Sequence, residues 1–128
     1  MSDVTNVLLV GVGGQGTILA SKILTMGLIE NGYDVKMSEV HGMSQRGGDV
    51  QSNLRISDQP IASDLIPSGK CDLIISLEPM EGLRYLPYLG HEGWLVTNET
   101  PFVILPHYPA ASDVLAEIKT LRLIVVVH

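Results

Sequence analysis

The strand–turn–helix pattern at the start of the chain constrains its fold more than any other feature. Val7–Val10 is a continuous apolar run, typical of a strand buried on both faces. A glycine-rich turn follows at Gly11–Gly16, and the apolar residues of Thr17–Glu30 recur at roughly helical spacing. Asp34–Val40 has the pattern of a second strand. A crossover of this length predicts parallel, right-handed pairing of the two strands.

Further predicted elements follow along the chain. We predict strands at Val50–Ser57, Asp72–Leu77, Gly93–Asn98 and Leu123–Val127, and helices at Ile61–Ile66, Pro79–Leu86 and Ser112–Leu121. The strand at Val50–Ser57 follows the second strand too closely for a helical crossover, so we expect it in an antiparallel or edge position. The predicted fold class is therefore α/β: a Rossmann-like three-layer sandwich with a mostly parallel sheet and one antiparallel or edge strand.

The size and charge of the chain exclude some functions. Its 128 residues are predicted to form a single domain, 1–128, with one hydrophobic core. Apolar residues make up 45% and charged residues 17%, which is typical of a globular chain. Lys and Arg number 8 against 14 Asp and Glu, a formal net charge of −6. This balance argues against nucleic-acid binding, which needs a basic surface.

The cysteine content and the hydropathy pattern indicate a cellular compartment. Cys71 is the only cysteine, so the chain cannot form an internal disulfide or hold an iron–sulfur cluster, which takes several thiolates. Its place before a predicted strand fits a small buried hydrophobe. No stretch approaches the roughly 18 apolar residues that span a membrane, and the first residues lack the pattern of a signal peptide. We therefore expect a cytoplasmic protein without a membrane segment.

The last predicted strand, Leu123–Val127, is of the buried type. A parallel strand of this kind normally has helices on both faces. No helical segment follows it in the sequence. We therefore expect either a partner that covers this edge or a domain truncated at its C-terminus, and we favour truncation.

The glycine turn fits the pattern G-x-G-x-x-G at Gly11, Gly13 and Gly16, after a strand and before a helix. Such a turn lets the backbone approach a ligand and directs amides at an anion on the helix N-terminus. The same glycines can instead serve only close helix–strand packing. For NAD an acidic residue is also needed at the end of the second strand, and Glu39 is near that place. However, His41 follows it almost at once, unlike an ordinary ribose-binding loop.

The second chemistry-bearing segment is the polar loop SEVHGMSQRGG at Ser38–Gly48. Its three glycines indicate a constrained backbone, although an ordinary solvated loop is the alternative. Arg46 is suited to bind a carboxylate or phosphate, and His41 to donate a hydrogen bond or exchange a proton. The four histidines of the chain share no ligand spacing, so no metal site is predicted.

The two loops together resemble a known family. GVGGQG after an N-terminal strand, followed by SEVHGMSQRGG, resembles the gamma-type subunits of 2-oxoacid:ferredoxin oxidoreductases, with the beta subunits of indolepyruvate oxidoreductases most similar. The segments SLEPMEGLRYLPYL and TPFVILPHYP also look like this family, so the resemblance covers essentially the whole chain. The family's members are longer, which agrees with the truncation expected above.

This resemblance implies a multi-part enzyme that oxidatively decarboxylates 2-oxoacids, of the indolepyruvate or pyruvate type, to acyl-coenzyme A. It places thiamine diphosphate, magnesium and iron–sulfur clusters on a companion subunit, from which electrons reach ferredoxin. This chain is then the accessory partner of that subunit in an oligomeric complex. It is inactive alone and carries no catalytic residue or metal ligand.

The predicted site lies on the two loops. We expect coenzyme A, whose phosphates suit a helix N-terminus, as a ligand of Gly11, Gly13, Gly14, Gln15, Gly16 and Arg46. The residues expected to face the partner subunit or a substrate are Glu39, His41, Ser44, Gln45, Arg46 and Gly47. Two alternatives stay open: a stand-alone NAD(P)- or FAD-binding Rossmann dehydrogenase or nucleotide sensor, and a pure scaffold that binds no small molecule.

Overall fold

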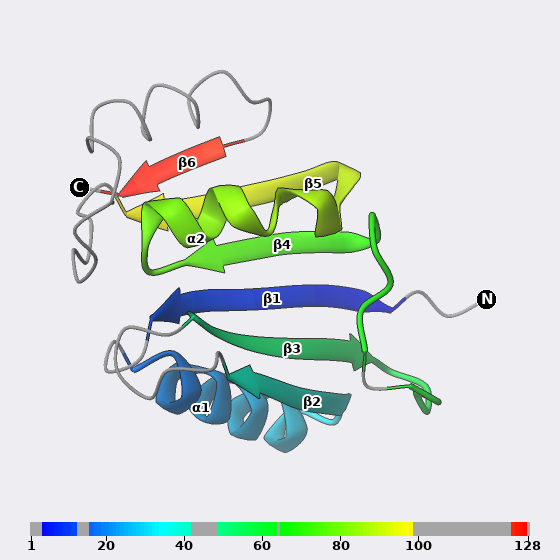
Figure 1. The fold of residues 1–128 in the computed structure, drawn as a ribbon. Coiled ribbons are helices and arrows are strands. Elements are labelled where there is room, and N and C mark those ends of the chain that lie inside the picture. Colours follow the sequence, from blue (N-terminus) through cyan, green and yellow to red (C-terminus); the bar gives the residue numbers. More distant parts are fainter. Residues whose placement is uncertain (1–3, 13–15, 42–48, 64, 99–123, 128) are drawn as a thin grey trace.

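A computed structural model describes residues 4–12, 16–41, 49–63, 65–98 and 124–127. Six of its elements form one sheet with the strand order β2-β3-β1-β4-β5-β6 (Figure 1). The strands are β1 (Thr5–Val12), β2 (Asp34–His41), β3 (Asp49–Ser57), β4 (Cys71–Ser76), β5 (Leu89–Asn98) and β6 (Ile124–Val127). The helices are α1 (Thr17–Glu30), α2 (Pro79–Arg84) and the short 3-10 helix η1 (Leu86–Tyr88).

The position of β3 confirms the antiparallel pairing expected of it and corrects the pairing expected between β1 and β2. It lies inside the sheet, antiparallel to β2 on one side and to β1 on the other, and not at an edge. β1 and β2 therefore run parallel without pairing to each other, contrary to the pairing predicted from the crossover length. A short β2–β3 connection favours an antiparallel pair, and Ser52, Asn53 and Leu54 are buried as an interior strand requires. The three pairs β1–β4, β4–β5 and β5–β6 are parallel, so the sheet is mixed rather than mostly parallel.

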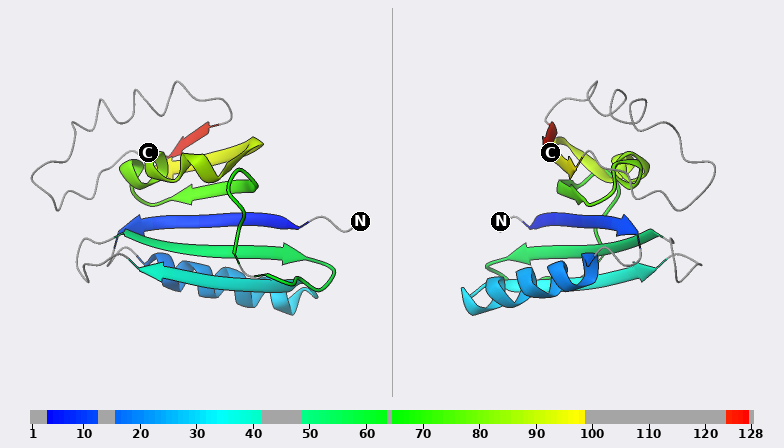
Figure 2. Two further views of the ribbon diagram at one scale, coloured as in Figure 1. Left: turned by 45° about the vertical axis from the view of Figure 1, so that its right-hand side comes forward. Right: turned by 90° about the vertical axis from the view of Figure 1, so that its left-hand side faces the viewer.

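The α/β three-layer class is confirmed, because α1 and α2 cover opposite faces of the sheet (Figure 2). On the face of α2, Leu8, Val10, Ile74 and Leu95 form a buried cluster against which Met80 and other α2 and η1 side chains pack. On the other face a cluster of Val7, Leu9 and Leu54 is joined by side chains that include Met37, which contacts Thr25 of α1. Alternate residues of β1 thus supply both cores.

Helix α1 packs on the sheet in an unexpected orientation. Its buried residues are Thr17 and Ser21, whereas Leu19, Ile23 and Met26 are 63%, 62% and 63% exposed. The spacing of its apolar residues correctly predicts a helix, but these three do not enter the core. Apolar residues surround much of α1, so their period leaves its rotation undetermined. Small side chains at positions 17 and 21 allow the helix to lie close to the strands.

The segment between β3 and β4 is not the short helix expected at Ile61–Ile66. In its described residues the backbone groups bond to the sheet instead: Ile61 N donates to Asp34 Oδ2 at 3.0 Å, and Arg55 Nη1 donates to the carbonyl of Ser63 at 2.9 Å. The helix expected at Pro79–Leu86 is present as α2, and the one expected at Ser112–Leu121 lies outside the described residues. Within the described ranges, no helix is long and apolar enough to cross a membrane.

A polar network joins the strands at the edge where β1 begins. Asn6 N donates to Asp72 Oδ2 at 2.8 Å, and Asn6 Nδ2 donates to the Lys70 carbonyl at 2.9 Å. Arg55 Nε donates to Asn6 Oδ1 at 3.0 Å. Cys71 is fully buried next to this network, and its burial raises the pKa of the thiol to about 11. Asn6 therefore connects β1 to both neighbouring strands.

Candidate functional site

The two predicted loops start from one edge of the sheet. β1, β2, β4, β5 and β6 all end there, on the left of Figure 1, and β3 begins there. Val12, the last residue of β1, pairs with Asp49, the first residue of β3, and His41 pairs with Val50. The residues flanking both loops are thus held side by side through β3. The residues that anchor both loops therefore lie at the carboxyl edge of the sheet.

Gly16 provides the turn from the first loop into α1. Its φ is +83°, a left-handed conformation that glycine adopts without strain, and its carbonyl accepts the Ala20 amide at 2.9 Å. A Cβ at this position would meet nothing within 4 Å, so glycine is required by the backbone conformation and not by crowding. The first turn of α1 carries no acidic residue. The helix N-terminus is therefore compatible with an anion.

Glu39 lies at the wrong distance for a dinucleotide site. It belongs to β2, pairs with Ser52 of β3 and lies on the same face as Met37 and α1. Because β3 separates β2 from β1, Glu39 is two strand spacings, roughly 10 Å, from the strand that carries the glycine turn. In the dinucleotide fingerprint the acidic residue is on the strand next to the first. This topology disfavours the NAD reading of the motif.

The other predicted residues divide into described and undescribed ones. Gly11 is buried within β1 opposite Val50, and His41 ends β2. Their roles, like those of Gly16 and Glu39, stay predictions. The remaining candidates lie outside the described residues, and their roles also stay predictions: Gly13, Gly14, Gln15, Ser44, Gln45, Arg46 and Gly47.

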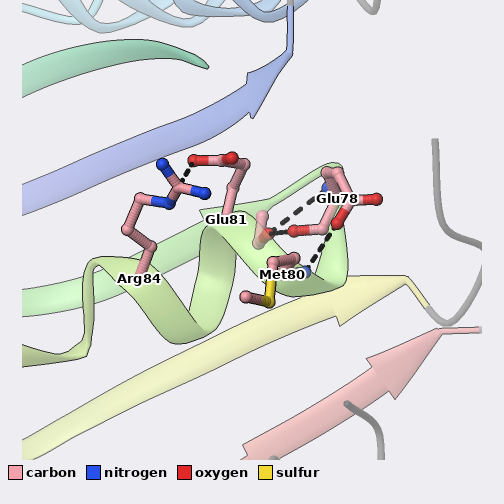
Figure 3. A network of polar contacts seen from close by, with 5 residues as sticks. Glu78, Met80, Glu81 and Arg84 are labelled. Carbon is pink, nitrogen blue, oxygen red and sulfur yellow. Dashed lines mark hydrogen bonds and ion pairs between the residues drawn. The ribbon is translucent and has the colours of Figure 1, made fainter. Parts of the chain in front are cut away.

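A third turn at this edge, between β4 and α2, was not singled out by the sequence (Figure 3). The Leu77 amide donates to the Val10 carbonyl at 2.9 Å, which holds the turn beside the end of β1. Glu78, only 1% exposed, accepts the Met80 amide on Oε1 at 2.6 Å and so caps α2. Ser76 Oγ donates to the Glu78 carbonyl and accepts its amide. The sequence feature that could have revealed this turn is the Glu78-Pro79 pair after a buried strand, because a proline at the first helical position is preceded by the N-cap residue.

Glu81 places a second carboxylate beside this turn. It is 5% exposed, and its Oε2 lies 3.5 Å from Arg84 Nε (Figure 3). Gly82 lets α2 approach β4, because a Cβ there would lie 3.0 Å from Ser76 Oγ. The carboxyl edge thus combines a helix N-terminus that is compatible with an anion with two nearly buried carboxylates. Among the described residues, no group of three or more His, Cys, Asp and Glu side chains is placed to hold a metal ion.

Comparison with known proteins identifies the family. Residues 6–127 match the model of the family described as pyruvate ferredoxin/flavodoxin oxidoreductase. The chain belongs to this family. Similar proteins within the oxidoreductase family include the indolepyruvate oxidoreductase subunit IorB of Pyrococcus horikoshii, 44% identical over 75% of this chain and 47% of its own length. IorB of Methanothermobacter thermautotrophicus is 36% identical over 89% of this chain and 60% of its own length. The chain spans about half the length of the first of these relatives.

Solved structures of the oxidoreductase family share the fold. The gamma subunit of a keto/oxoacid ferredoxin oxidoreductase from Geobacter sulfurreducens is 26% identical, with a TM-score of 0.61 over 82% of this chain and 56% of that one. Pyruvate oxidoreductase subunit PORC from Thermotoga maritima is 20% identical, with a TM-score of 0.67 over 97% of this chain and 61% of that one. A 2-oxoglutarate:ferredoxin oxidoreductase from Magnetococcus marinus is 13% identical, with a TM-score of 0.69 over 93% of this chain and 22% of that one. It was solved with 2-oxoglutarate, coenzyme A and succinyl-CoA bound. The resemblance inferred from the two loops is thereby confirmed at the level of the family.

Proposed function

We propose that this chain is the gamma-type part of an indolepyruvate:ferredoxin oxidoreductase. The observation that carries the proposal is the family match over residues 6–127, supported by IorB relatives of 36–44% identity. In the overall reaction a 2-oxoacid and coenzyme A give an acyl-coenzyme A and carbon dioxide, and two electrons reduce ferredoxin. Thiamine diphosphate, when bound, supplies the carbanion chemistry, and iron–sulfur clusters carry the electrons. The reaction takes place in the cytoplasm in this proposal.

The chain acts as an accessory partner in this proposal. A cluster is held by about four thiolates, and this sequence supplies only Cys71, which is buried. The clusters are therefore assigned to a companion subunit, together with the thiamine diphosphate and magnesium that the family resemblance implies there. The carboxyl edge is the surface proposed to face that subunit, because it gathers the starts of both glycine-containing loops and the β4–α2 turn. Open sheets bind ligands and partners at this edge.

Coenzyme A is the small molecule proposed to reach the same edge. Gly13, Gly14 and Gln15 would cradle its phosphates at the N-terminus of α1, with Arg46 near one of them. The left-handed Gly16 and the acid-free first turn of α1 support this placement. Glu78 and Glu81 lie at the same edge, and their charges would repel a phosphate placed over α2. The proposed phosphate position is therefore at α1, away from the β4–α2 turn.

The decisive experiment reconstitutes the complex. This chain is co-expressed with the thiamine- and cluster-containing subunit encoded nearest to it, and indolepyruvate-dependent reduction of ferredoxin is measured with coenzyme A present. Copurification together with activity that depends on both proteins supports the proposal. Failure to copurify, or full activity of the large subunit alone, refutes it.

Calorimetric titration of the assembled complex with coenzyme A tests the finer point. Arg46→Ala and Gly14→Val should weaken binding, whereas Lys70→Ala, an exposed position distant from this edge, should not. Equal binding by all variants excludes the glycine turn as the cradle without affecting the subunit assignment. NAD serves as the comparison ligand. If it binds, NAD at 100 times its Kd should stabilise the protein by about 2.7 kcal/mol, which a thermal melt would detect.

A further inference from the structure

The outer side of α1 carries an apolar patch that the sheet does not use. The patch consists of five side chains whose exposed fractions are 45–63%: Leu19, Ile23, Met26, Ile29 and Tyr33. The strands that α1 contacts are β1, β2 and β3, all on its other side (Figure 2). Large contiguous apolar patches on a protein surface usually mark an interaction site.

A shallow groove lies beside this patch. Its volume is about 470 Å³, and its lining includes Ile23, Leu24, Gly27 and Tyr33. Gly27 leaves the middle of the helix flat, since a Cβ there would meet nothing within 4 Å. A flat position in the middle of a helix allows a second helix to approach closely and insert a side chain. The shape of this surface therefore suits a helix as its partner.

The order of residues in the patch identifies the partner. Ile23 and Ile29 are equally far from Met26 along α1. Two copies of α1 that cross antiparallel at Met26 would therefore set Ile23 of each copy level with Ile29 of the other. Such self-complementarity is the requirement of a two-fold interface.

The charges on α1 obey the same symmetry. Lys22 and Glu30 are the helix's charged residues, both exposed, and both lie four residues from Met26 on opposite sides. Within one chain they are eight residues, about 12 Å, apart along the helix axis, and neither takes part in an ion pair in the described part of the chain. In the antiparallel arrangement Lys22 of each copy lies level with Glu30 of the other. The crossing would thus form two equivalent ion pairs.

We propose that the outer side of α1 is a homodimer interface, in which two copies of this chain pair their α1 helices antiparallel about a two-fold axis at Met26. This surface lies on the outer side of α1, whereas the residues that anchor the loops assigned to the companion subunit lie at the carboxyl edge of the sheet. Its 14-residue helix is about 21 Å long, so the contact is smaller than the roughly 800 Å² per partner of a stable interface. The dimer is therefore reversible, with a Kd on the order of micromolar or weaker.

Sedimentation equilibrium of the 128-residue chain over about a hundredfold range of concentration tests the proposal. A monomer–dimer equilibrium is expected. Met26→Glu should weaken association by about tenfold or more, because it places two carboxylates together at the axis. Leu65→Glu is the matched control, since Leu65 is also exposed, at 58%, but belongs to the β3–β4 connection and not to α1. A chain that stays monomeric throughout, or a dimer unaffected by Met26→Glu, overturns the proposal.

A charge exchange tests the antiparallel geometry independently of folding. Lys22→Glu and Glu30→Lys should each weaken self-association by about 3–10-fold, since each creates two like-charged contacts. A mixture of the two variants should form a heterodimer at least as tight as the native dimer, because every contact becomes Glu against Lys. The double variant Lys22→Glu/Glu30→Lys should also recover association. A mixture that associates no better than either variant alone refutes the crossing at Met26.

Discussion

Gly93 offers a sharp test of the packing between β4 and β5. It lies where the register shifts: Cys71 pairs with Leu89, but Leu73 pairs with Trp94. A Cβ built on Gly93 would lie 2.7 Å from the Cys71 carbonyl oxygen and 2.6 Å from Leu89 Cδ1. Both distances are shorter than real Cβ contacts. Gly93→Ala should therefore force the two strands apart or displace Leu89.

The expected cost follows from these contacts. Overpacking a core with one methyl group costs about 1–3 kcal/mol, and the upper part of that range applies because a backbone oxygen cannot rotate away. Alanine lowers the conformational entropy of the unfolded chain relative to glycine, and this offsets about 0.4–1 kcal/mol of the cost. The free energy of unfolding should thus fall by about 2 kcal/mol, and Tm by roughly 8 °C for a domain of this size. Urea unfolding followed by circular dichroism measures the free energy of unfolding, and a thermal melt measures Tm.

Two comparisons make this test decisive. Gly27→Ala adds a methyl group in open space on a helix and should raise stability by up to about 1 kcal/mol. Leu89→Ala removes the side-chain part of the clash and leaves the Cys71 carbonyl. The double variant with Gly93→Ala should therefore be less stable than Leu89→Ala alone. Stability of Gly93→Ala within about 0.5 kcal/mol of the native chain would refute the reasoning.

Further predictions concern a thiol, a turn, a cap and a buried amide. Burial raises the pKa of Cys71 to about 11 from 9.0, so its contribution to stability is complete below pH 9 and is lost as the pH rises towards 11. The stability of the native chain relative to Cys71→Ala should therefore fall by about 2–3 kcal/mol over that interval in urea titrations, and an unchanged difference would contradict the shift. Gly16→Ala should cost about 1–2 kcal/mol, because its φ is +83°, and Gly16→Asn less; equal losses would argue against conformational strain. Glu78→Ala should cost about 1 kcal/mol through the lost cap, with Glu78→Gln closer to the native value in thermal melts. Asn6→Ala should cost about 1–3 kcal/mol, since it leaves the Lys70 carbonyl and Arg55 without this partner, and a neutral result would show that water replaces the amide.

The sequence predicts the local elements well because their signals are local. The apolar run at Val7–Val10 lies within β1, the range Thr17–Glu30 predicted as a helix matches α1, and Pro79 correctly starts α2. The insertion of β3 between β1 and β2 was not predicted, because chain connectivity does not reveal which side of a hairpin pairs with a third strand. The rotation of α1 was missed for a different reason: Leu19 and Ile23 are as apolar as core residues but face outward.

The candidate site was predicted only in outline. The carboxyl edge follows from parallel strands, and Gly16 occupies the left-handed turn that its motif requires. The buried Glu78 and Glu81 were missed because carboxylates are mostly exposed and their residue type alone gives no sign of burial. Glu78 is buried because it caps α2, and that role depends on the tertiary position of Ser76 and Val10.

The interior position of β3 has a mechanical consequence for the two loops. The same strand pairs with Val12, where the glycine turn begins, and with His41, where the polar loop begins. The pairing of β3 with both strands therefore fixes the position of Val12 relative to His41. A slip of β3 by two residues against β1 alone would displace these two residues from each other by about 7 Å. Sequence changes within either loop leave that offset untouched. An insertion or deletion in β3 would reset it, and could separate binding of a small ligand from docking of a subunit without altering a residue of either loop.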